Sequence, residues 1–418
     1  MNRRIKALSV LAVVAVAAAG CGGGSTSNTG SGTTLVVGVD LPFQGSAKDS
    51  SDDTWNAMNL YLEQVGGKAG NYKVELKKYD DSTAAAGAWD PAQCTKNAND
   101  HVANANEVAV MGTFNSGCAK IIAPILNAAS DGPMSMISHA NTNPGLTKSW
   151  DPGEPDKYFP NGKRNYGRVV TTDDIQGPAG AQFAAKDLKV TKCFVIDDTE
   201  TYGKGVADTF AAEAQKQGIA VVGRTSWKKG DANYTALFGA AKAAGADCVF
   251  FGGIYDNNGG QLVKDKVAVL GDNNVVKLVA PDGFTGYPEF NALPAAVGAY
   301  LTFAGLSTDV IKANGGVPAK FIDDYKAKYG ADPRSSYALY GVQALQVILA
   351  AIEKSDGTRK GVRDAIFEGS GISIDASKAV VGKTITVDPK TGDVNAKDIT
   401  VEVVKDGKET FLKAWPVS

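Results

Sequence analysis

The chain has 418 residues and a formal net charge of −2, from 43 basic and 45 acidic side chains. This length exceeds what one hydrophobic core normally organises, so we expect two lobes. The mild acidity, without a Lys/Arg stripe, argues against nucleic acid as a partner. No stretch of about 18 uninterrupted apolar residues occurs, which argues against a membrane-spanning helix.

The N-terminal residues have the pattern of an export signal. Basic residues at 3, 4 and 6 precede a short apolar stretch, which ends in small residues directly before Cys21. This pattern is typical of a secretory signal, and a cysteine at the first mature position is typical of a bacterial lipoprotein. We expect residues 1–20 to be a lipoprotein signal peptide, Cys21 to be lipidated, and the Gly/Ser/Thr-rich residues 21–34 to be a flexible tether. The alternative is an ordinary secretory signal that happens to precede a cysteine.

Four further cysteines follow, at Cys94, Cys118, Cys193 and Cys248. An exported protein meets an oxidising compartment, and an even count permits two disulfides. We expect Cys94 to pair with Cys118, because both lie near helices of one lobe. Cys193 and Cys248 each begin a predicted strand, and we expect them to form the second disulfide; the alternative is two buried free thiols. No two cysteines have metal-ligand spacing and the two histidines lie far apart, so we expect no metal site.

Strand and helix patterns then alternate along the chain. In the first part we expect strands over 34–43, 72–81, 107–114 and 134–140, and helices over 52–65, 91–103 and 118–130. This βαβα order implies a parallel sheet with helices on both faces.

The same rhythm begins again after an irregular stretch. Helices are expected over 177–189 and 205–218, and strands over 192–198, 219–227, 247–256 and 275–284. Three more helices (318–330, 335–354 and 358–369) and strands over 383–388 and 399–415 complete the chain. The sequence therefore predicts two α/β lobes of similar size and order.

Several catalytic signatures are incomplete. Residues 381–384 end like a P-loop, but Ser377 stands where that motif requires glycine. Residues 203–205 begin like a dinucleotide fingerprint, but Asp208 replaces its third glycine. No G-x-S-x-G elbow occurs, and two histidines leave little material for a catalytic triad. These failures argue against an enzyme.

Polar residues follow several predicted strands of the first lobe. The strand that ends at Gly112 leads to Ser116 at a helix start, and the next strand ends in His139 and Thr142. Open α/β sheets bind ligands at the carboxyl ends of strands, and free N–H groups at a helix start suit an anion. The alternative is that Ser116 and Thr142 merely cap helices.

Strand ends of the second lobe carry aromatic and acidic residues. Tyr202, Tyr255 and Phe284 can pack against the apolar part of a ligand, and Asp282 can pair with a cation. An aspartate at a strand end is more often a turn former, so its role depends on what faces it.

Several segments recur in the order and spacing of a known family: VGVDLPFQGS, MGTFNSG, ISHANTNPGLT, DIQGPAG, DTETYGKG, APDGF, YALYGVQALQ and VDPKTGDV. From residue 35 to the C-terminus the chain resembles the extracellular solute-binding proteins of branched-chain amino acid ABC importers, which have the type I periplasmic-binding fold. The resemblance implies two Rossmann-like lobes with parallel central sheets, joined by a three-crossing hinge. The N-terminal lobe would comprise 35–170 and 303–392, and the C-terminal lobe 171–302 and 393–418.

The resemblance also implies a ligand site. The part that holds a ligand carboxylate and one side of its ammonium would be Ser116, Gly117, Ala140 and Thr142. From the second lobe, Tyr202 in a Tyr-Gly-x-Gly turn would close over the ligand, and Asp282 would meet the ammonium. The side-chain pocket would be shaped by Tyr255 or Ile254, Phe284 and Tyr337, with Gln44 and Trp55 as weaker candidates at the rim. Asp282 is one methylene shorter than the family's Glu, and His139 stands where a smaller or stiffer residue is common, so ligand identity stays open.

The function implied is the substrate-binding component of an ABC importer, which binds a small polar solute, an amino acid of branched-chain type first of all. Its partners would be permease subunits with a cytoplasmic ATPase, and a lipid anchor would hold the monomer at the extracytoplasmic face of a bacterial membrane. No cofactor is expected. The alternatives are a sensor of the same fold for an amide or small carboxylate, a surface hydrolase that uses Ser116 or His139, and a structural lipoprotein.

Overall fold

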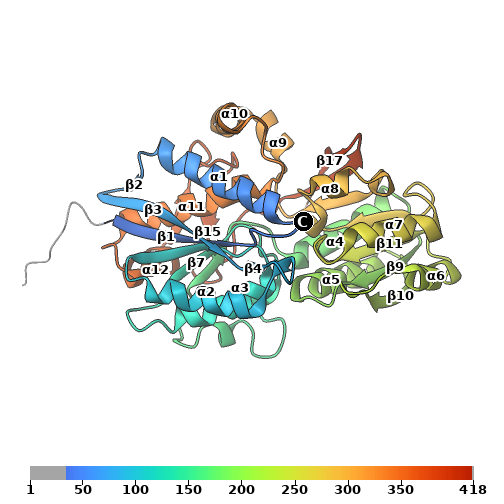
Figure 1. Cartoon of the computed structure of the whole chain (residues 1–418), viewed down its shortest axis with the longest axis horizontal. Coiled ribbons are helices and arrows are strands. Elements are labelled where there is room, and N and C mark those ends of the chain that lie inside the picture. Colours follow the sequence, from blue (N-terminus) through green and yellow to red (C-terminus); the bar gives the residue numbers. More distant parts are fainter. Residues whose placement is uncertain (1–33, 417–418) are drawn as a thin grey trace, which may run out of the picture. The chain divides into compact units, whose positions relative to one another are not determined.

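The computed structural model describes residues 34–416, so the predicted signal peptide, Cys21 and nearly all of the tether lie outside the described residues. Two open sheets organise the described chain (Figure 1). The first has the strand order β2-β3-β1-β6-β7-β8, with the bounds Lys68–Ala69, Tyr72–Asp80, Thr34–Leu41, Glu107–Gly112, Ser135–Ser138 and Tyr166–Arg168. All of its pairs are parallel except β2 with β3.

Helices cover both faces of the first sheet, α1 and α11 on the upper side and α2 and α3 on the lower side in Figure 1. The bounds are α1 Lys48–Gln64, α2 Pro91–Ala103, α3 Ser116–Asn127, α11 Tyr337–Lys354 and α12 Arg359–Phe367. The buried, alternating residues Leu35, Val37 and Val39 of β1 share one core with α1, α11 and α12. Val110 and Met136 pack with α2 and α3 in a second core.

The second sheet has the strand order β10-β9-β11-β12-β13-β16-β17. The bounds, in that order, are Ala220–Ser226, Lys192–Asp197, Cys248–Gly252, Lys277–Ala280, Tyr300–Phe303, Ile399–Lys405 and Lys408–Trp415. Its first five strands are parallel, whereas β16 and β17 add in antiparallel fashion. The expectation of parallel central sheets is therefore confirmed, and antiparallel strands lie at one edge of each sheet, β2 in the first and β16–β17 in the second.

Helices also cover both faces of the second sheet: α4 (Asp173–Lys186) and α5 (Thr201–Lys216) on one, and α6 (Thr235–Ala243), α7 (Gly259–Leu270) and α8 (Pro288–Asn291) on the other. The remaining elements are α9 Thr308–Ala313, α10 Gly316–Tyr329, and the ribbons β4–β5 (Ser82–Thr83, Ala88–Trp89) and β14–β15 (Ile372–Ile374, Ile385–Val387).

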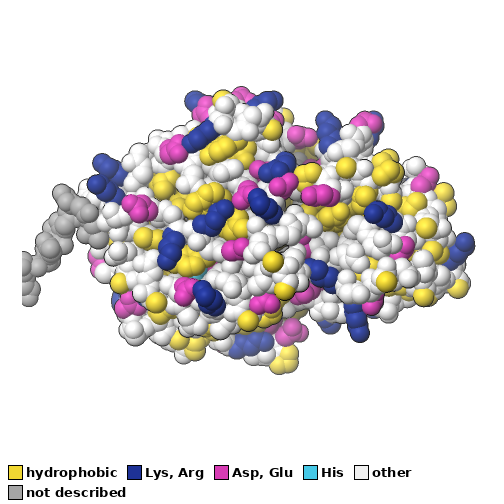
Figure 2. Space-filling model, in the orientation of Figure 1, with side chains coloured by type: hydrophobic (Ala, Val, Ile, Leu, Met, Phe, Trp, Pro, Cys, Tyr) yellow, Lys and Arg dark blue, Asp and Glu magenta, His cyan; other side chains and the backbone are white. Residues whose placement is uncertain are grey.

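The chain passes between the two sheets three times: after β8, after β13 and before β16. The two-lobed α/β fold that the sequence predicts is confirmed. Within residues 34–416, no helix combines the length and apolar character that crossing a bilayer requires. Acidic and basic side chains alternate over the face drawn in Figure 2, without a large patch of one sign.

Local sequence explains where elements begin and turn. Helix α2 begins at Pro91 because the Asp90 carboxylate accepts hydrogen bonds from the amides of Ala92 and Gln93, and proline suits a first helical position. The strand expected over 399–415 is instead a hairpin. Asp406 and Gly407 both have positive φ, 53° and 75°, as a two-residue hairpin turn requires.

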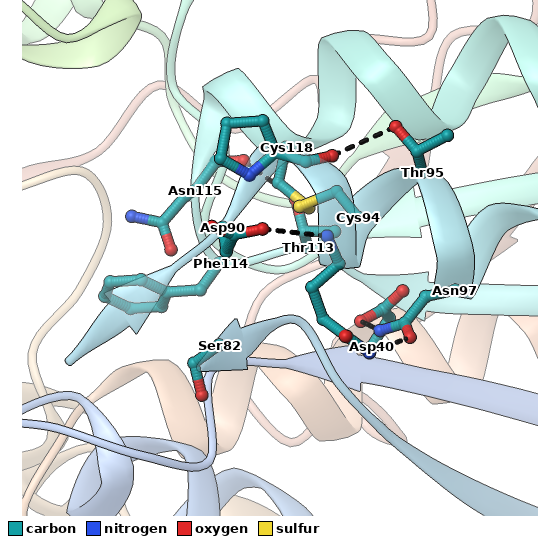
Figure 3. The surroundings of a disulfide bond; sticks show 12 residues. Asp40, Ser82, Asp90, Cys94, Thr95, Asn97, Thr113, Phe114, Asn115 and Cys118 are labelled. Carbon is teal, nitrogen blue, oxygen red and sulfur yellow. Dashed lines mark hydrogen bonds between the residues drawn. A yellow bond between two sulfur atoms is a disulfide. The ribbon is translucent and has the colours of Figure 1, made fainter. Parts of the chain in front are cut away.

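The cysteines divide into one bonded pair and one free pair. Cys94 of α2 and Cys118 of α3 form a disulfide, which ties the two helices together beside Asn115 (Figure 3). Cys193 and Cys248 are buried free thiols, so the second disulfide is not formed. They face each other on the parallel neighbours β9 and β11. Residues paired in register project their side chains side by side from the same face of the sheet and not towards each other, which does not favour a disulfide.

Candidate functional site

A pocket lies where loops of the two lobes meet. It is lined by Trp89, Phe114, Asn115, Ser116, Gly117, Ala140, Glu200, Tyr202, Ile254, Asp282, Gly283 and Tyr337. The space left free in it, about 20 Å³, has room for roughly one water molecule. A larger ligand can therefore occupy this place only if the lobes or their side chains move.

The first-lobe half of the pocket is the start of α3. The chain leaves β6, passes Phe114 and Asn115, and enters α3 at Ser116. In Figure 3 the side chains of Phe114 and Asn115 point away from the disulfide. A Cβ on Gly117 would come within 2.7 Å of the Trp89 ring, so glycine lets this ring lie against the helix start. Backbone N–H groups in the first turn of a helix lack helical partners and favour an anion.

Asp282 is the central acid of the second-lobe half. Its side chain is 1% exposed, and its two carboxylate oxygens accept hydrogen bonds from the hydroxyls of Tyr202 and Tyr337. Burial raises the pKa of Asp282, and these two hydroxyls oppose the increase. Tyr202 comes from α5 and Tyr337 from α11, so the carboxylate joins the two lobes.

Asp173 is a second buried acid, and the sequence analysis did not single it out. It is the first residue of α4, directly after a crossing between the lobes. It is fully buried, and neither of its carboxylate oxygens has a hydrogen-bond partner among the described residues. Burial, and then the nearby Asp282, raise its pKa well above the usual value. The signal for Asp173 in the sequence was its position, an acidic residue close to the predicted crossing between the lobes.

Asp198 holds two lining segments of the second lobe together. One oxygen of its buried carboxylate accepts from the amide of Glu200 at 3.0 Å, and the other accepts from the amide of Ile254 at 3.0 Å. Burial raises the pKa of Asp198 to about 7, despite these hydrogen bonds. The β9–α5 loop and the loop after β11 are thereby fixed relative to each other.

Six of the nine predicted ligand residues line the pocket: Ser116, Gly117, Ala140, Tyr202, Asp282 and Tyr337. Tyr202 lies in the first turn of α5 and not in a separate turn. Thr142 is buried beside the pocket; its backbone oxygen accepts from the amide of Asp173 at 2.9 Å, and its hydroxyl has no partner among the described residues.

Two predicted residues lie elsewhere. Phe284 is fully buried in the second lobe, where its ring packs against Phe251 and Phe290. It follows Asp282 by two residues in a tight 3₁₀ turn, and such a turn rotates about 120° per residue, which directs the two side chains apart. Tyr255 borders a separate groove, and its neighbour Ile254 lines the pocket instead.

The weaker candidates also lie outside the pocket lining. The Gln44 amide donates to Asp80 at 2.8 Å, and Trp55 packs against the first-lobe core. The sequence analysis missed Trp89, Phe114, Asn115, Glu200 and Gly283. Phe114 and Asn115 belong to the MGTFNSG segment, which was the signal for them. Nothing in the sequence distinguishes Trp89, because it enters from a ribbon of two-residue strands.

The geometry does not provide a hydrolase site at His139. The His139 ring is 1% exposed and packs against Phe114 and Tyr337. Burial lowers the pKa of His139 to about 3. Among the described contacts, the Ser116 hydroxyl accepts from the amide of Asn143 at 3.4 Å, and His139 makes no hydrogen bond to it. A proton relay between the two is therefore not assembled.

Known proteins resemble the chain over nearly its whole length. A Leu/Ile/Val-binding protein homolog of Brucella melitensis is 29% identical over 386 residues, which are 91% of this chain and 94% of that protein. The structure of a leucine-binding protein from Thermotoga maritima matches with a TM-score of 0.74 at 22% identity, covering 91% of this chain and 98% of that one. A solute-binding protein of an ABC transporter from R. palustris, in complex with benzoate, matches with a TM-score of 0.73 at 18% identity, covering 92% and 98%.

The family assignment rests on a match along most of the chain. The model of the periplasmic binding protein family matches residues 34–408. This range contains the whole first sheet, the second sheet as far as the start of β17, all three crossings and every residue that lines the pocket. The chain belongs to the periplasmic binding protein family.

Proposed function

We propose that this chain is the solute-binding component of an ABC importer and that it binds a small α-amino acid between its two lobes. The branched-chain amino acids are the first candidates, because the relatives include Leu/Ile/Val-binding proteins and a leucine-binding protein. The family is one of binding proteins, so the function is binding and delivery, not catalysis. The family also supports an extracytoplasmic location.

One observation carries the choice of a zwitterion: the two halves of the pocket have opposite electrostatic preferences. The start of α3 presents free amides, which suit a carboxylate. The second lobe presents the buried Asp282 carboxylate, with Asp173 close by, which suits an ammonium. Burying a zwitterion requires that both of its charges meet such partners.

An aromatic carboxylate is the second candidate, since a structural neighbour holds benzoate and the pocket has aromatic walls. Among the described residues that line the pocket none is basic, and two are acidic, Asp282 and Glu200. A ligand with a carboxylate and no positive group would bring a further negative charge beside these two carboxylates. Its only favourable polar contact would be with the amides at the start of α3. The lining therefore favours the amino acid.

Binding would proceed by hinge closure between a lobe of 35–170 and 303–392 and a lobe of 171–302 and 393–418. In the structure, the side-chain amide of Asn143 donates to the backbone carbonyl oxygen of Thr201 at 3.0 Å. The Lys229 ammonium donates to the backbone carbonyl oxygen of Ala86 at 2.6 Å. Both hydrogen bonds join the two lobes and would break on opening; Ala86 and Lys229 line the separate groove that Tyr255 borders. A ligand that contacts both lobes would shift the population towards the closed form.

The central test is a ligand screen followed by Asp282→Ala. Isothermal titration calorimetry against amino acids and benzoates should show amino acid binding. Asp282→Ala should weaken it by about 2–5 kcal/mol, because the variant leaves a buried ammonium without its partner. Asp100→Ala, at an exposed aspartate of α2, is the matched control and should bind normally. Unchanged affinity in Asp282→Ala would remove this residue from the site.

The anchor and the partners are the remaining parts of the proposal. Cys21, acylated after cleavage of residues 1–20, would hold a monomeric receptor at the membrane, where permease subunits with a cytoplasmic ATPase would receive the ligand. Cys21→Ser should move the protein from the membrane fraction to the soluble fraction with its ligand affinity unchanged. Loss of ligand binding in Cys21→Ser would contradict the tether role. A sensor would leave ligand uptake intact when the gene is deleted, whereas an importer component would not.

A further inference from the structure

Two polar side chains line the pocket and make no hydrogen bond to the rest of the described protein. Asn115 directly precedes α3 in the first lobe, and Glu200 directly precedes α5 in the second. Side chains at such positions commonly accept hydrogen bonds from the helix amides, but neither of these does so. Both residues line the same pocket.

The Asn115 side chain is buried without using its carbonyl oxygen. The residue is 7% exposed, and Oδ1 has no hydrogen-bond partner among the described residues. A buried acceptor that is left unused destabilises the fold. Since the side chain turns away from the disulfide (Figure 3) and lines the pocket, a ligand is the partner that would satisfy it.

The Glu200 carboxylate is half-buried and has neither an ion pair nor a side-chain hydrogen bond among the described contacts. The Glu200 backbone, in contrast, is fixed: its amide donates to Asp198 at 3.0 Å, and its carbonyl accepts from the Lys204 amide at 3.0 Å. Burial raises the pKa of Glu200, and the positive charge of Lys229 partly opposes this. The acid is thus held at the pocket by its backbone while its carboxylate stays available.

The two residues come from opposite lobes, at helix starts that meet across the pocket. Between them, the side-chain amide of Asn143 already donates a hydrogen bond to the backbone oxygen of Thr201, the first residue of α5. Closure of the lobes therefore brings an acceptor from each side against whatever the pocket contains.

We propose that Asn115 and Glu200 form a specificity-determining pair that binds N–H donors at the end of the ligand side chain. This inference rests on the proposed function and narrows it: the preferred ligand is an α-amino acid of about the size of leucine whose side chain ends in an amide or amine. Asp282 and the start of α3 hold the two charges of the amino acid backbone, and Asn115 and Glu200 select its side chain.

Leucine, asparagine and aspartate test this selection, because their side chains are similar in shape and differ at their ends. Calorimetry on the intact mature protein should show that asparagine binds at least about tenfold more tightly than leucine, because its N–H groups donate to a charged acceptor. Aspartate should bind most weakly, because its side-chain carboxylate is repelled by that of Glu200. In Glu200→Gln the preference for asparagine over aspartate should shrink at least about tenfold. Alanine, whose side chain has no terminal polar group, is the reference ligand against which the other three affinities are compared.

Glu353→Gln, at an exposed position of α11, removes the same charge outside the pocket and should keep the wild-type preferences. Asn115→Leu should favour leucine over asparagine and provides a second variant, independent of Glu200. Tighter binding of leucine than asparagine, with a ratio unaffected by Glu200→Gln and Asn115→Leu, would overturn the inference. If none of the four amino acids binds, the proposed function itself is contradicted, and the inference with it.

Discussion

Two buried polar clusters of this molecule differ in how completely they are paired. In the first lobe, the His101 ring lies between the carboxylates of Asp40 and Glu107. Asn97 donates to Asp40 at 3.0 Å, and Tyr79 donates to Glu107 at 2.6 Å. Each of these charged groups has a partner, although His101, Asp40 and Glu107 are fully buried.

The cluster at the pocket is different. Asp173 and the Thr142 hydroxyl have no hydrogen-bond partner among the described residues, and Asn115 and His139 each leave one polar atom unpaired. An unpaired buried polar group destabilises the fold. The paired cluster therefore stabilises the first lobe, whereas the unpaired one is typical of a surface that a ligand completes.

Removing His101 should have the largest effect on stability. His101→Leu leaves Asp40 and Glu107 buried without their shared cation, which should cost about 3–5 kcal/mol of unfolding free energy. Urea unfolding followed by circular dichroism measures this loss. His139→Leu is the matched comparison, because His139 is equally buried and makes no described side-chain hydrogen bond; it should cost much less. Equal losses in the two variants would contradict the difference drawn between the clusters.

The pH dependence of stability should also distinguish the His101 cluster from the cluster at the pocket. Burial alone would lower the pKa of His101, but hydrogen bonds to Asp40 and Glu107 outweigh it and raise the pKa to about 9. Because the unfolded value is about 6.5, this group contributes its full stabilisation below pH 6.5 and loses about 3 kcal/mol as the pH rises through 9. His139 has the opposite sign: its pKa is lowered to about 3, so its contribution is lost as the pH falls below about 6.5. The alkaline loss should be absent in His101→Leu.

The sequence predicts those parts of the site that depend on strand ends. Ser116, Ala140 and Asp282 follow strands whose apolar pattern is clear, and parallel strands bring their carboxyl ends to one edge. The choice between Ile254 and Tyr255 depends on a contact between distant segments, since Asp198 binds the Ile254 amide. No periodic pattern encodes such a contact.

Buried acidic residues are even harder to predict from the sequence. His101 and Asp40 are separated by 61 positions, so their pairing follows from the packing of α2 against β1 and not from any motif. Asp173 stands in an ordinary helix-start position, where acids are common on exposed surfaces. Only the fold reveals that this residue is fully buried and near Asp282. Composition and spacing therefore predict the lobes, but not which of their acids lose access to water.

Asp173→Asn and Asp81→Asn separate the effect of burial from that of the ligand. Both aspartates are fully buried, have no side-chain hydrogen bond among the described residues and have a pKa raised well above the usual value, chiefly by burial. Asp81 lies beside the disulfide of Cys94 and Cys118 and is not part of the pocket lining. A raised carboxyl pKa makes stability fall as the pH rises above about 4, so each asparagine variant should gain about 1 kcal/mol at pH 7.

Ligand affinity should then distinguish the two variants. Asp173→Asn should weaken amino acid binding, because it removes a carboxylate close to Asp282 that the ligand ammonium would neutralise. Asp81→Asn should gain stability without losing affinity. Thermal unfolding with and without ligand measures both quantities in one experiment. Equal ligand affinity in the two variants would mean that the unpaired Asp173 is a cost of the fold, as Asp81 is, and that an unpaired buried acid does not by itself identify the ligand site.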